Sequence, residues 1–393
     1  MVAPMVTRRG SWPSVLALAL LALVAGPLAG FPVLTHIAYL LILLLLLCAL
    51  YTALSLRLTR LEHRVATTRL YAGERLLEVY RLWTRAPWPV FSVYVAGRAG
   101  VARTGPYWVA ALGPRGHEEL TALATAAARG RYRVGAAVLA VSDPLGIVVR
   151  RRRYVASGEV VVWPQPRIVP DFAQAAARAG DLLPARRSWA NMPVAGAVRP
   201  FAPGDPSTRI HWLSSVRHGF LMVKDSDRSA GQRLWVALDL VSSAHAGAGE
   251  ESTVEYGVEA AAYAVELSYK EGLDVGLVVA GVETLVAEPR RGQVQREYVR
   301  DMLAVARAGA GPALVLTLDE QRIVRPSDAV VIVTPDPAPE LQEYAARLRR
   351  LGCGVIVVLL DAAAFGGSPI ATTDVARLED ERVIICPLTR GGG

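Results

Sequence analysis

The hydrophobic pattern divides the chain into an apolar N-terminal part, a part of short alternating runs, and a part with longer mixed periods. Residues 14–31 and 33–56 are almost wholly apolar, and the second run carries no charged residue. At about 1.5 Å per residue, a helix over 33–56 is long enough to cross a hydrocarbon layer of about 30 Å. The first run, interrupted by Pro27, is marginal. We therefore predict a transmembrane helical hairpin within residues 1–64.

Arginines flank both ends of this hairpin. Arg8 and Arg9 precede it and Arg57, Arg60 and Arg64 follow it, whereas the connection between the runs carries no fixed charge. Because basic residues favour the cytoplasmic side, we expect both ends in the cytoplasm. The expected location is the cell membrane, multi-pass, with the soluble domains in the cytoplasm. In the alternative, the first run is a cleaved signal peptide and the second helix still holds the rest of the chain in the cytoplasm.

Short alternating runs over residues 66–170 predict a β-sandwich. Residues 90–95 alternate large and small side chains, and 143–146 (Asp-Pro-Leu-Gly) has the composition of a tight turn between apolar strands. Residues 118–129 have the propensity of a helix, but their apolar positions alternate, so we predict a strand there.

Residues 230–390 alternate between buried-strand and amphipathic-helix patterns. Near-continuous apolar strands between such helices indicate a mostly parallel sheet covered on both faces, an α/β doubly wound domain. Residues 171–229 are predicted to be a connector followed by a distinctive segment. The predicted strands are 233–240, 275–280, 329–334, 355–360 and 383–386, and the predicted helices are 253–271, 294–307 and 339–351.

The segment 199–225 predicts a turn, a helix and a short strand. Pro203-Gly204 is typical of a turn, and Asp205 is a favoured N-cap because its carboxylate accepts from the free amides of the first turn. Pro206 suits the first helical position. At the other end, Gly219 is expected to end the helix in a left-handed conformation.

This segment resembles the signature of domain-of-unknown-function family 58, Arg-x-Tyr-x-Pro-Gly-Asp, Arg-Ile-(Asp or His)-Trp and Ala-Arg-x-Gly-x-Leu-x-Val-Lys. Phe201 replaces the usual tyrosine, and Thr208 stands where an arginine is usual, beside Arg209. The residues singled out as the signature are Arg199, Pro203, Gly204, Asp205, Arg209, Trp212, Arg217, Gly219 and Lys224.

The resemblance implies that residues 230–390 form a von Willebrand factor A-like domain. Such domains hold magnesium at an Asp-x-Ser-x-Ser motif with a distant threonine and aspartate. Here Asp239 and Ser243 match, Val241 replaces the first serine, Asp336 is the candidate second aspartate, and no threonine is evident. Since magnesium prefers octahedral oxygen ligands, the sequence predicts a degenerate site that could hold Mg²⁺ only weakly. In the alternative, Asp239 caps the next loop without any metal.

The residue composition limits which binding partners and which enzymatic reactions are expected for the protein. The net charge of +8 rests almost wholly on arginine, with Arg150 to Arg153 as the densest run. The three cysteines are far apart, which excludes a disulfide framework and a zinc motif. Phosphate-loop, zinc-protease and nucleophile-elbow motifs are absent from the sequence, so we predict that the protein is not an enzyme. No aromatic residues are interleaved with the arginines, so nucleic acid is not expected as a partner.

The resemblance implies a membrane-anchored protein-interaction scaffold or adaptor. Relatives in the family are thought to act with a MoxR-type AAA+ ATPase in the assembly or activation of other proteins, so a protein partner of that type is expected. The alternative, from the residues alone, is a surface protein that binds anionic lipid or another polyanion through its arginine clusters.

Overall fold

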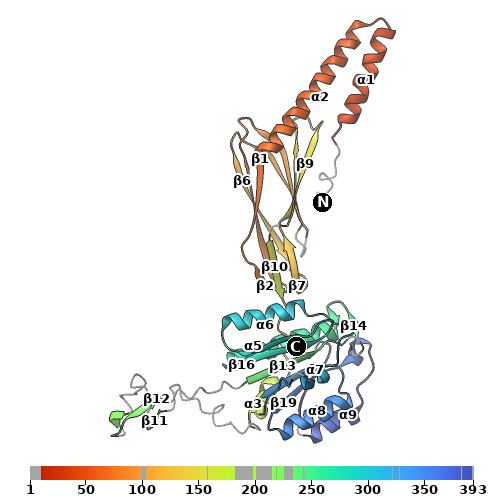
Figure 1. The fold of residues 1–393 in the computed structure, drawn as a ribbon. Coiled ribbons are helices and arrows are strands. Elements are labelled where there is room, and N and C mark those ends of the chain that lie inside the picture. The colour runs from red at the N-terminus through yellow and green to blue at the C-terminus, as the bar shows by residue number, and fades with distance from the viewer. Residues whose placement is uncertain are drawn as a thin grey trace. The chain divides into compact units, whose positions relative to one another are not determined.

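The chain consists of two compact units, Met1–Trp163 and Pro164–Gly393 (Figure 1). The computed structural model describes residues 10–98, 103–156, 158–181, 198–200, 215–217, 219–224, 233–241, 243, 245–320, 322–326, 328–381 and 383–391.

Two apolar helices, α1 (Trp12–Leu28) and α2 (Pro32–Leu58), form an antiparallel hairpin at the start of the first unit (Figure 1). They approach closely, since a Cβ on Gly26 would lie 2.5 Å from Thr35 Oγ1. In the part of the chain that the structure describes, α2 alone is long and apolar enough to cross a membrane, while α1 has 17 residues. One apolar helix near the N-terminus is consistent with membrane anchoring. A second span and its orientation stay predictions.

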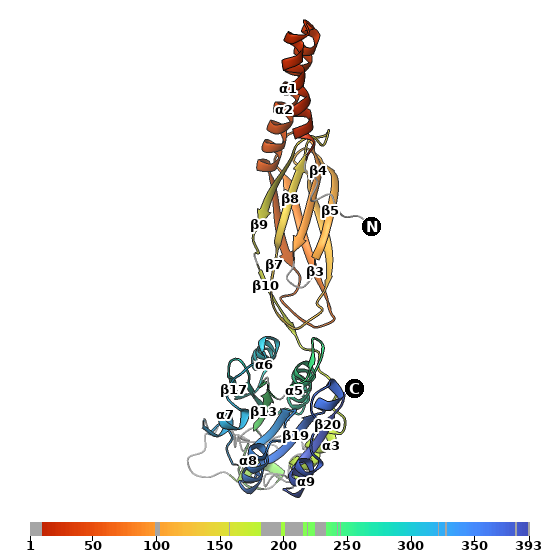
Figure 2. The ribbon, with the colours of Figure 1, turned by 90° about the vertical axis from the view of Figure 1, so that its right-hand side faces the viewer.

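Antiparallel sheets make up the rest of the first unit. One has the strand order β1-β3-β6. A second has the order β5-β4-β8-β9, and its four strands lie side by side in Figure 2. A third sheet, β2-β10-β7, includes one parallel pair, β2 with β10. The strands are β1 (Thr59–Val65), β2 (Arg69–Tyr71), β3 (Arg75–Thr84), β4 (Val90–Arg98), β5 (Arg103–Leu112), β6 (His117–Thr125), β7 (Gly130–Val134), β8 (Ala136–Ser142), β9 (Val149–Tyr154) and β10 (Gly158–Trp163).

Alternate residues of facing strands fill the core of this unit. Leu61 and Leu82 from the first sheet pack with Val93, Leu139 and Val141 from the second, and all five are buried. This alternation explains why most of residues 118–129 form a strand: β6 buries Ala122 and Ala124 on one face, although it ends at Thr125 and leaves 126–129 outside the strand. The turn at 143–146 is also present, because the Asp143 carboxylate accepts from the amide of Leu145 at 2.9 Å.

The second unit is built on a six-stranded sheet with the order β17-β16-β13-β18-β19-β20. All neighbours are parallel except β17, which pairs antiparallel with β16 at the edge. The strands are β13 (Arg233–Asp239), β16 (Asp274–Ala280), β17 (Leu285–Arg290), β18 (Ala329–Thr334), β19 (Gly354–Leu360) and β20 (Ile384–Leu388).

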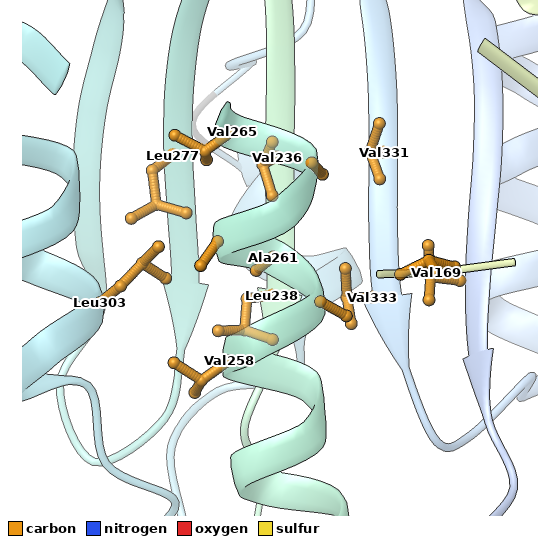
Figure 3. Packing of buried hydrophobic residues seen from close by; sticks show 14 of the residues in the cluster. Val169, Val236, Leu238, Val258, Ala261, Val265, Leu277, Leu303, Val331 and Val333 are labelled. Atoms are coloured by element: carbon orange, nitrogen blue, oxygen red, sulfur yellow. The ribbon is translucent and has the colours of Figure 1, made fainter. Parts of the chain in front are cut away.

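Helices cover both faces of this sheet. Residues Val236, Leu238 and Val331 of the strands pack against Ala261 of α5 and Leu303 of α6 on one face (Figure 3). The opposite face packs against α7, α8 and α9. The helices of this unit are α3 (Phe172–Asp181), α5 (Thr253–Lys270), α6 (Gln293–Val305), α7 (Leu314–Glu320), α8 (Pro339–Arg350), η4 (Ala362–Phe365) and α9 (Thr372–Asp380), and short strands pair as β11 (Val198–Pro200) with β12 (Met222–Lys224) and β14 (Gly247–Ala248) with β15 (Glu251–Ser252).

Several elements differ from the sequence prediction. The edge strand β17 and the helices α7 and α9 have no counterpart in it, because they are short and half exposed. The last strand of the first unit ends at Trp163, whereas the predicted sandwich extended to residue 170. Val169, which fell in the predicted sandwich, and Phe172, which fell in the predicted surface connector, are both buried in the core of the second unit.

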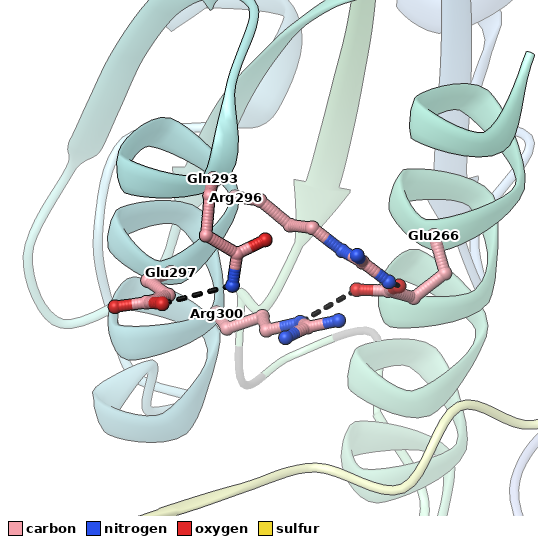
Figure 4. A network of polar contacts seen from close by, with 5 residues as sticks. All are labelled: Glu266, Gln293, Arg296, Glu297 and Arg300. Carbon is pink, nitrogen blue, oxygen red and sulfur yellow. Dashed lines mark hydrogen bonds and ion pairs between the residues drawn. The ribbon is translucent and has the colours of Figure 1, made fainter. Parts of the chain in front are cut away.

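A polar cluster joins α5 to α6 (Figure 4). Arg300 Nε donates to Glu266 Oε1 at 2.6 Å, and Arg296 Nε donates to Glu266 Oε2 at 3.0 Å. The side chains of Glu266 and Arg300 are only 11% and 9% exposed. On the outer side of α6, Gln293 donates to Glu297. The ion pairs of Glu266 therefore hold α5 against α6.

Candidate functional site

The strand order of the second unit's sheet reverses between β13 and β18, and this reversal leaves a crevice at the carboxyl ends of these strands. After β13 the chain adds β16 and β17 on one side, and it then crosses to place β18 on the other side. In doubly wound sheets, ligands bind beyond the carboxyl ends of the strands where the order reverses in this way. The expected position therefore lies beyond Asp239 and Thr334, the last residues of β13 and β18.

A hydroxyl and two carboxyl residues meet at this point. Thr334 Oγ1 donates to Asp239 Oδ2 at 2.9 Å and accepts from the amide of Asp336 at 3.1 Å. The other carboxylate oxygen of Asp239 accepts from the amide of Val241 at 3.1 Å. Thr334 is 1% exposed, so its hydroxyl is held rigidly between the two aspartates. The sequence analysis found no threonine for this site, although Thr334 directly precedes Pro335 and Asp336 at the strand end.

Two hollows flank these residues, and we call them together the switch-point cleft. One has a volume of about 370 Å³ and is walled by Leu314, Leu316 and Leu341 beside Asp239. The other, about 470 Å³, is more polar and includes His245. Both are lined by Ser243 and Asp336, so the three residues predicted for a metal site do lie around one cleft.

His245 supports the floor of the cleft. Its Nε2 lies 2.9 Å from the carbonyl oxygen of Asp239, and its Nδ1 lies 2.9 Å from Thr253 Oγ1. Burial lowers the pKa of His245, and this outweighs the raising effect of Asp239. Because a carbonyl oxygen can only accept, Nε2 is the donor to Asp239 O, while Nδ1 faces the Thr253 hydroxyl, which also donates to Ala246 O at 3.1 Å. His245 fixes the backbone at the end of β13.

The rim of the cleft is acidic. Loss of solvent around the carboxyl raises the pKa of Asp336, and the charges of Asp239, Glu340 and Asp374 raise it further. Since these four carboxyl groups lie close enough to raise the pKa of Asp336, a cation or a basic side chain would be stabilised here. Glu340 lies in the first turn of α8 and Asp374 in the first turn of α9, at the positive ends of both helices.

These residues fit a magnesium ion only in part. Within the described residues, no group of three or more His, Cys, Asp and Glu side chains is placed to hold a metal. Both carboxylate oxygens of Asp239 already accept from protein donors. Val241 also provides no hydroxyl at the position where the motif has its first serine. No mechanistic step is therefore assigned to a metal, and the degenerate site stays a prediction.

Magnesium titrated into the detergent-solubilised protein is expected to show no micromolar binding, since Mg²⁺ gives up its waters reluctantly and the ligand set is incomplete. Isothermal titration calorimetry measures this directly, with Asp239→Ala as the control variant. Micromolar binding that disappears in Asp239→Ala would contradict the degenerate site.

Replacing Thr334 by valine is expected to lower the free energy of unfolding by about 1–2 kcal/mol, because the shape is kept while Asp239 Oδ2 loses its donor. Thr373→Val, at an exposed position of α9, is the matched control and should be nearly neutral. Thermal or urea unfolding of the two variants tests this. Equal effects would show that the hydroxyl of Thr334 contributes nothing specific.

The structure describes only part of the family signature. Arg199 and Lys224 lie in the paired strands β11 and β12, and Gly219 has the predicted positive φ, 75°. Met222 N donates to the Ser215 hydroxyl at 2.8 Å, which ties the end of the segment together. Arg217 is exposed. Pro203, Gly204, Asp205, Arg209 and Trp212 lie outside the described residues, so the proposed N-cap is neither supported nor contradicted.

Two comparisons with known sequences bear on the family. Over 325 residues the chain is 23% identical to the uncharacterized protein YeaD of Bacillus subtilis (strain 168), a match that covers 80% of this chain and 78% of that protein. Residues 197–364 match the family model described as Protein of unknown function DUF58.

Solved structures show only partial likeness. The CARDB domain of the PF1109 protein from Pyrococcus furiosus is 17% identical with a TM-score of 0.20, covering 26% of this chain and 91% of that one. Proximal thread matrix protein 1 from the mussel byssus is 16% identical with a TM-score of 0.29, covering 40% and 44%. TM-scores of this size carry no argument about fold or function. The family model begins at the signature and ends beyond β19, so this stretch of the chain is similar to the DUF58 family of proteins of unknown function.

Proposed function

We propose that the protein is a membrane-anchored protein-interaction module whose switch-point cleft receives a segment of a partner protein. The observation that carries the proposal is the combination of an apolar wall and an acidic rim in one crevice. Leu316 is 55% exposed on the wall, and Asp336 and Glu340 line the same hollow. A concave site that combines apolar lining with a few polar groups is the usual form of a binding pocket.

The chemistry of the cleft defines the partner segment. An apolar side chain of the partner fills the side lined by Leu314 and Leu316, and a neighbouring lysine or arginine pairs with Asp336. Because Asp336 and Asp374 repel each other in the free protein, neutralisation by a basic residue adds to affinity. Binding of this kind needs no metal, and it persists in chelator.

The second unit is, in this proposal, a von Willebrand factor A-like domain. What supports it is the sheet order with one antiparallel edge strand, β17, and an aspartate at the end of the central strand β13. The partner expected from the family resemblance is a MoxR-type AAA+ ATPase. The helix α2 then holds the module at the cell membrane, with the cleft in the cytoplasm.

Site-specific photocrosslinking tests this proposal in membranes of the source organism. A photoreactive residue at Leu316, in the cleft, should give one crosslinked AAA+ ATPase, while the same residue at Val294 should not. Val294 is equally suitable for labelling because it is 85% exposed, but it lies at the start of α6, away from the cleft residues. Absence of a crosslink at Leu316, or the same products at both positions, would overturn the proposal.

A further inference from the structure

The C-terminal part of α2 belongs to the core of the β-sandwich. Tyr51 OH donates to the Pro89 carbonyl at 2.6 Å and accepts from the Phe91 amide at 3.2 Å. One turn later, Trp88 Nε1 donates to Ser55 Oγ at 3.0 Å, and Leu56 is buried among the strands. The helix therefore enters the sandwich directly, with no flexible linker between them.

The exposure of α2 changes abruptly at the same level. Large exposed apolar side chains follow one another along the helix up to Leu50, and from Tyr51 to Leu56 every residue is half-buried or buried. From Pro32 to Leu50 the helix is roughly 28 Å long, at about 1.5 Å for each of about 19 residues. This length matches a hydrocarbon layer of about 30 Å. A hydrocarbon layer that begins at Pro32 would therefore end near Tyr51.

Three loops surround the base of the hairpin at this level, and we call residues 85–89, 113–116 and 143–148 the collar. The amide of Arg85 donates to Leu58 O at the end of α2, and the amide of Arg115 donates to Ala86 O. On the other helix, the amide of Trp12 donates to Ile147 O at 3.0 Å. Backbone hydrogen bonds therefore fix all three loops to one another or to the hairpin.

The collar has the chemistry of a surface that lies in lipid headgroups. Leu145 is 64% exposed at the tip of its loop, and Trp12 is 48% exposed beside it. The one acidic residue of the collar, Asp143, is 1% exposed and accepts from the amides of Leu145 and Val148. Exposed cations at this end of the unit include Arg57, Arg60, Arg85, Arg115 and Arg150, and the exposed Glu118 of β6 lies two residues after the 113–116 loop.

We propose that the collar is a lipid-contact surface, with Leu145 at the boundary of the acyl chains and its arginines on the phosphates of anionic phospholipids. An apolar tip beside a tryptophan and several arginines is the pattern that favours the membrane interface. The inference rests on the membrane anchoring in the proposed function, and it adds that the β-sandwich lies directly on the bilayer. Because the chain enters the sandwich as a continuous helix, the bilayer also restricts the orientation of the first unit.

Depth measurement tests the apolar part of this surface. The full chain carrying Leu145→Cys, labelled with a fluorophore and reconstituted in vesicles, is expected to be strongly quenched by lipid with a nitroxide near its headgroup. Val155→Cys is the matched control, since Val155 is 89% exposed and follows β9, about 20 Å along the strand. The native cysteines are buried, so the unsubstituted protein is the labelling blank. Equal quenching at the two positions would overturn the proposal.

Lipid selectivity tests the charged part. In vesicles of phosphatidylcholine with phosphatidylglycerol, spin-labelled phosphatidylglycerol should be immobilised by the protein in preference to spin-labelled phosphatidylcholine. Substituting glutamine for Arg57, Arg85 and Arg115 together is expected to reduce this preference by at least about fivefold. A single basic residue near an anionic surface already contributes about a fivefold gain in binding. The control triple variant, with the same change of charge, replaces the exposed Arg75, Arg131 and Arg133.

The two triple variants separate a lipid surface from a general charge effect. An equal loss of preference in both would contradict a specific collar. Alkaline carbonate extraction of the unsubstituted protein separates this inference from its premise. Release of the protein by carbonate refutes the anchoring itself, whereas retention with equal quenching at the two cysteines refutes only the collar.

Discussion

Replacing Glu266 by alanine is expected to lower the free energy of unfolding of the second unit by about 3 kcal/mol, the largest loss that we expect from one side chain. The substitution leaves Arg300 buried without its carboxylate, and an uncompensated buried charge costs about 3–5 kcal/mol. Arg296, whose side chain is 31% exposed, can turn toward water and adds less. Hydrogen exchange of the α5 and α6 amides should become faster by about two orders of magnitude.

The same cluster predicts a pH dependence. Burial by itself raises the pKa of Glu266, but hydrogen bonds from Arg300 and Arg296 and their charges outweigh it, so the pKa of Glu266 lies below its ordinary value of 4.5. The stabilisation is therefore present above pH 4.5 and is lost as the pH falls through the folded value. Glu297→Ala, on the outer side of α6, is the control and should be nearly neutral. An equal loss of unfolding free energy in Glu266→Ala and Glu297→Ala would show that the buried ion pairs do not specifically stabilise the contact between α5 and α6.

Replacing Gly311 by alanine is expected to lower the free energy of unfolding by about 2–3 kcal/mol and to distort the switch-point cleft. A Cβ at this position would lie 1.8 Å from the carbonyl oxygen of Gly281, a backbone atom that cannot turn aside as the end of a flexible side chain could. The segment next to it is bonded to the end of the central strand, since Gly309 N donates to Leu240 O. It then leads into α7, whose Leu314 and Leu316 form the apolar wall of the cleft.

Urea unfolding measures the loss, and crosslinking from Leu316 reports on the wall. Ala310→Ser is the control, because Ala310 is exposed in the same loop. We expect the glycine variant to lose both stability and the crosslink, and the serine variant to keep both. If Gly311→Ala keeps full stability, then the contact with Gly281 relaxes without cost and the loop does not determine the shape of the cleft.

Local patterns along the chain were sufficient for much of the fold. The apolar helix α2 follows from a long run without charge, and β18 follows from six consecutive apolar or small residues that are buried on both faces. The alternation of Ala122 and Ala124 was enough to prefer a strand over a helix at β6. In each case the buried positions recur within one element, every two residues in a strand or about every 3.6 residues in a helix, and this recurrence is visible in the sequence.

Contacts between distant residues decided the site and the arrangement around it. Thr334 became part of the site only because β13 and β18 are adjacent, which brings its hydroxyl to Asp239, 95 positions away. His245 could have been noticed as a histidine near a strand end, but its partners Asp239 O and Thr253 follow from the folded loop. The edge strand β17 is short and contains Pro289, so its own strand propensity is low. It is a strand because it pairs with β16.

The sequence by itself therefore determined the apolar N-terminal helix, the alternating β region, the α/β region and the signature segment, because each depends on neighbours along the chain. Tertiary structure alone decided that Asp239, Thr334 and Asp336 share a cleft, that Glu266 joins α5 to α6, and that three loops surround the base of α2. The physical reason is that side-chain hydrogen bonds and ion pairs act over a few ångströms in space, and only the sheet order and helix packing place these residues within that range.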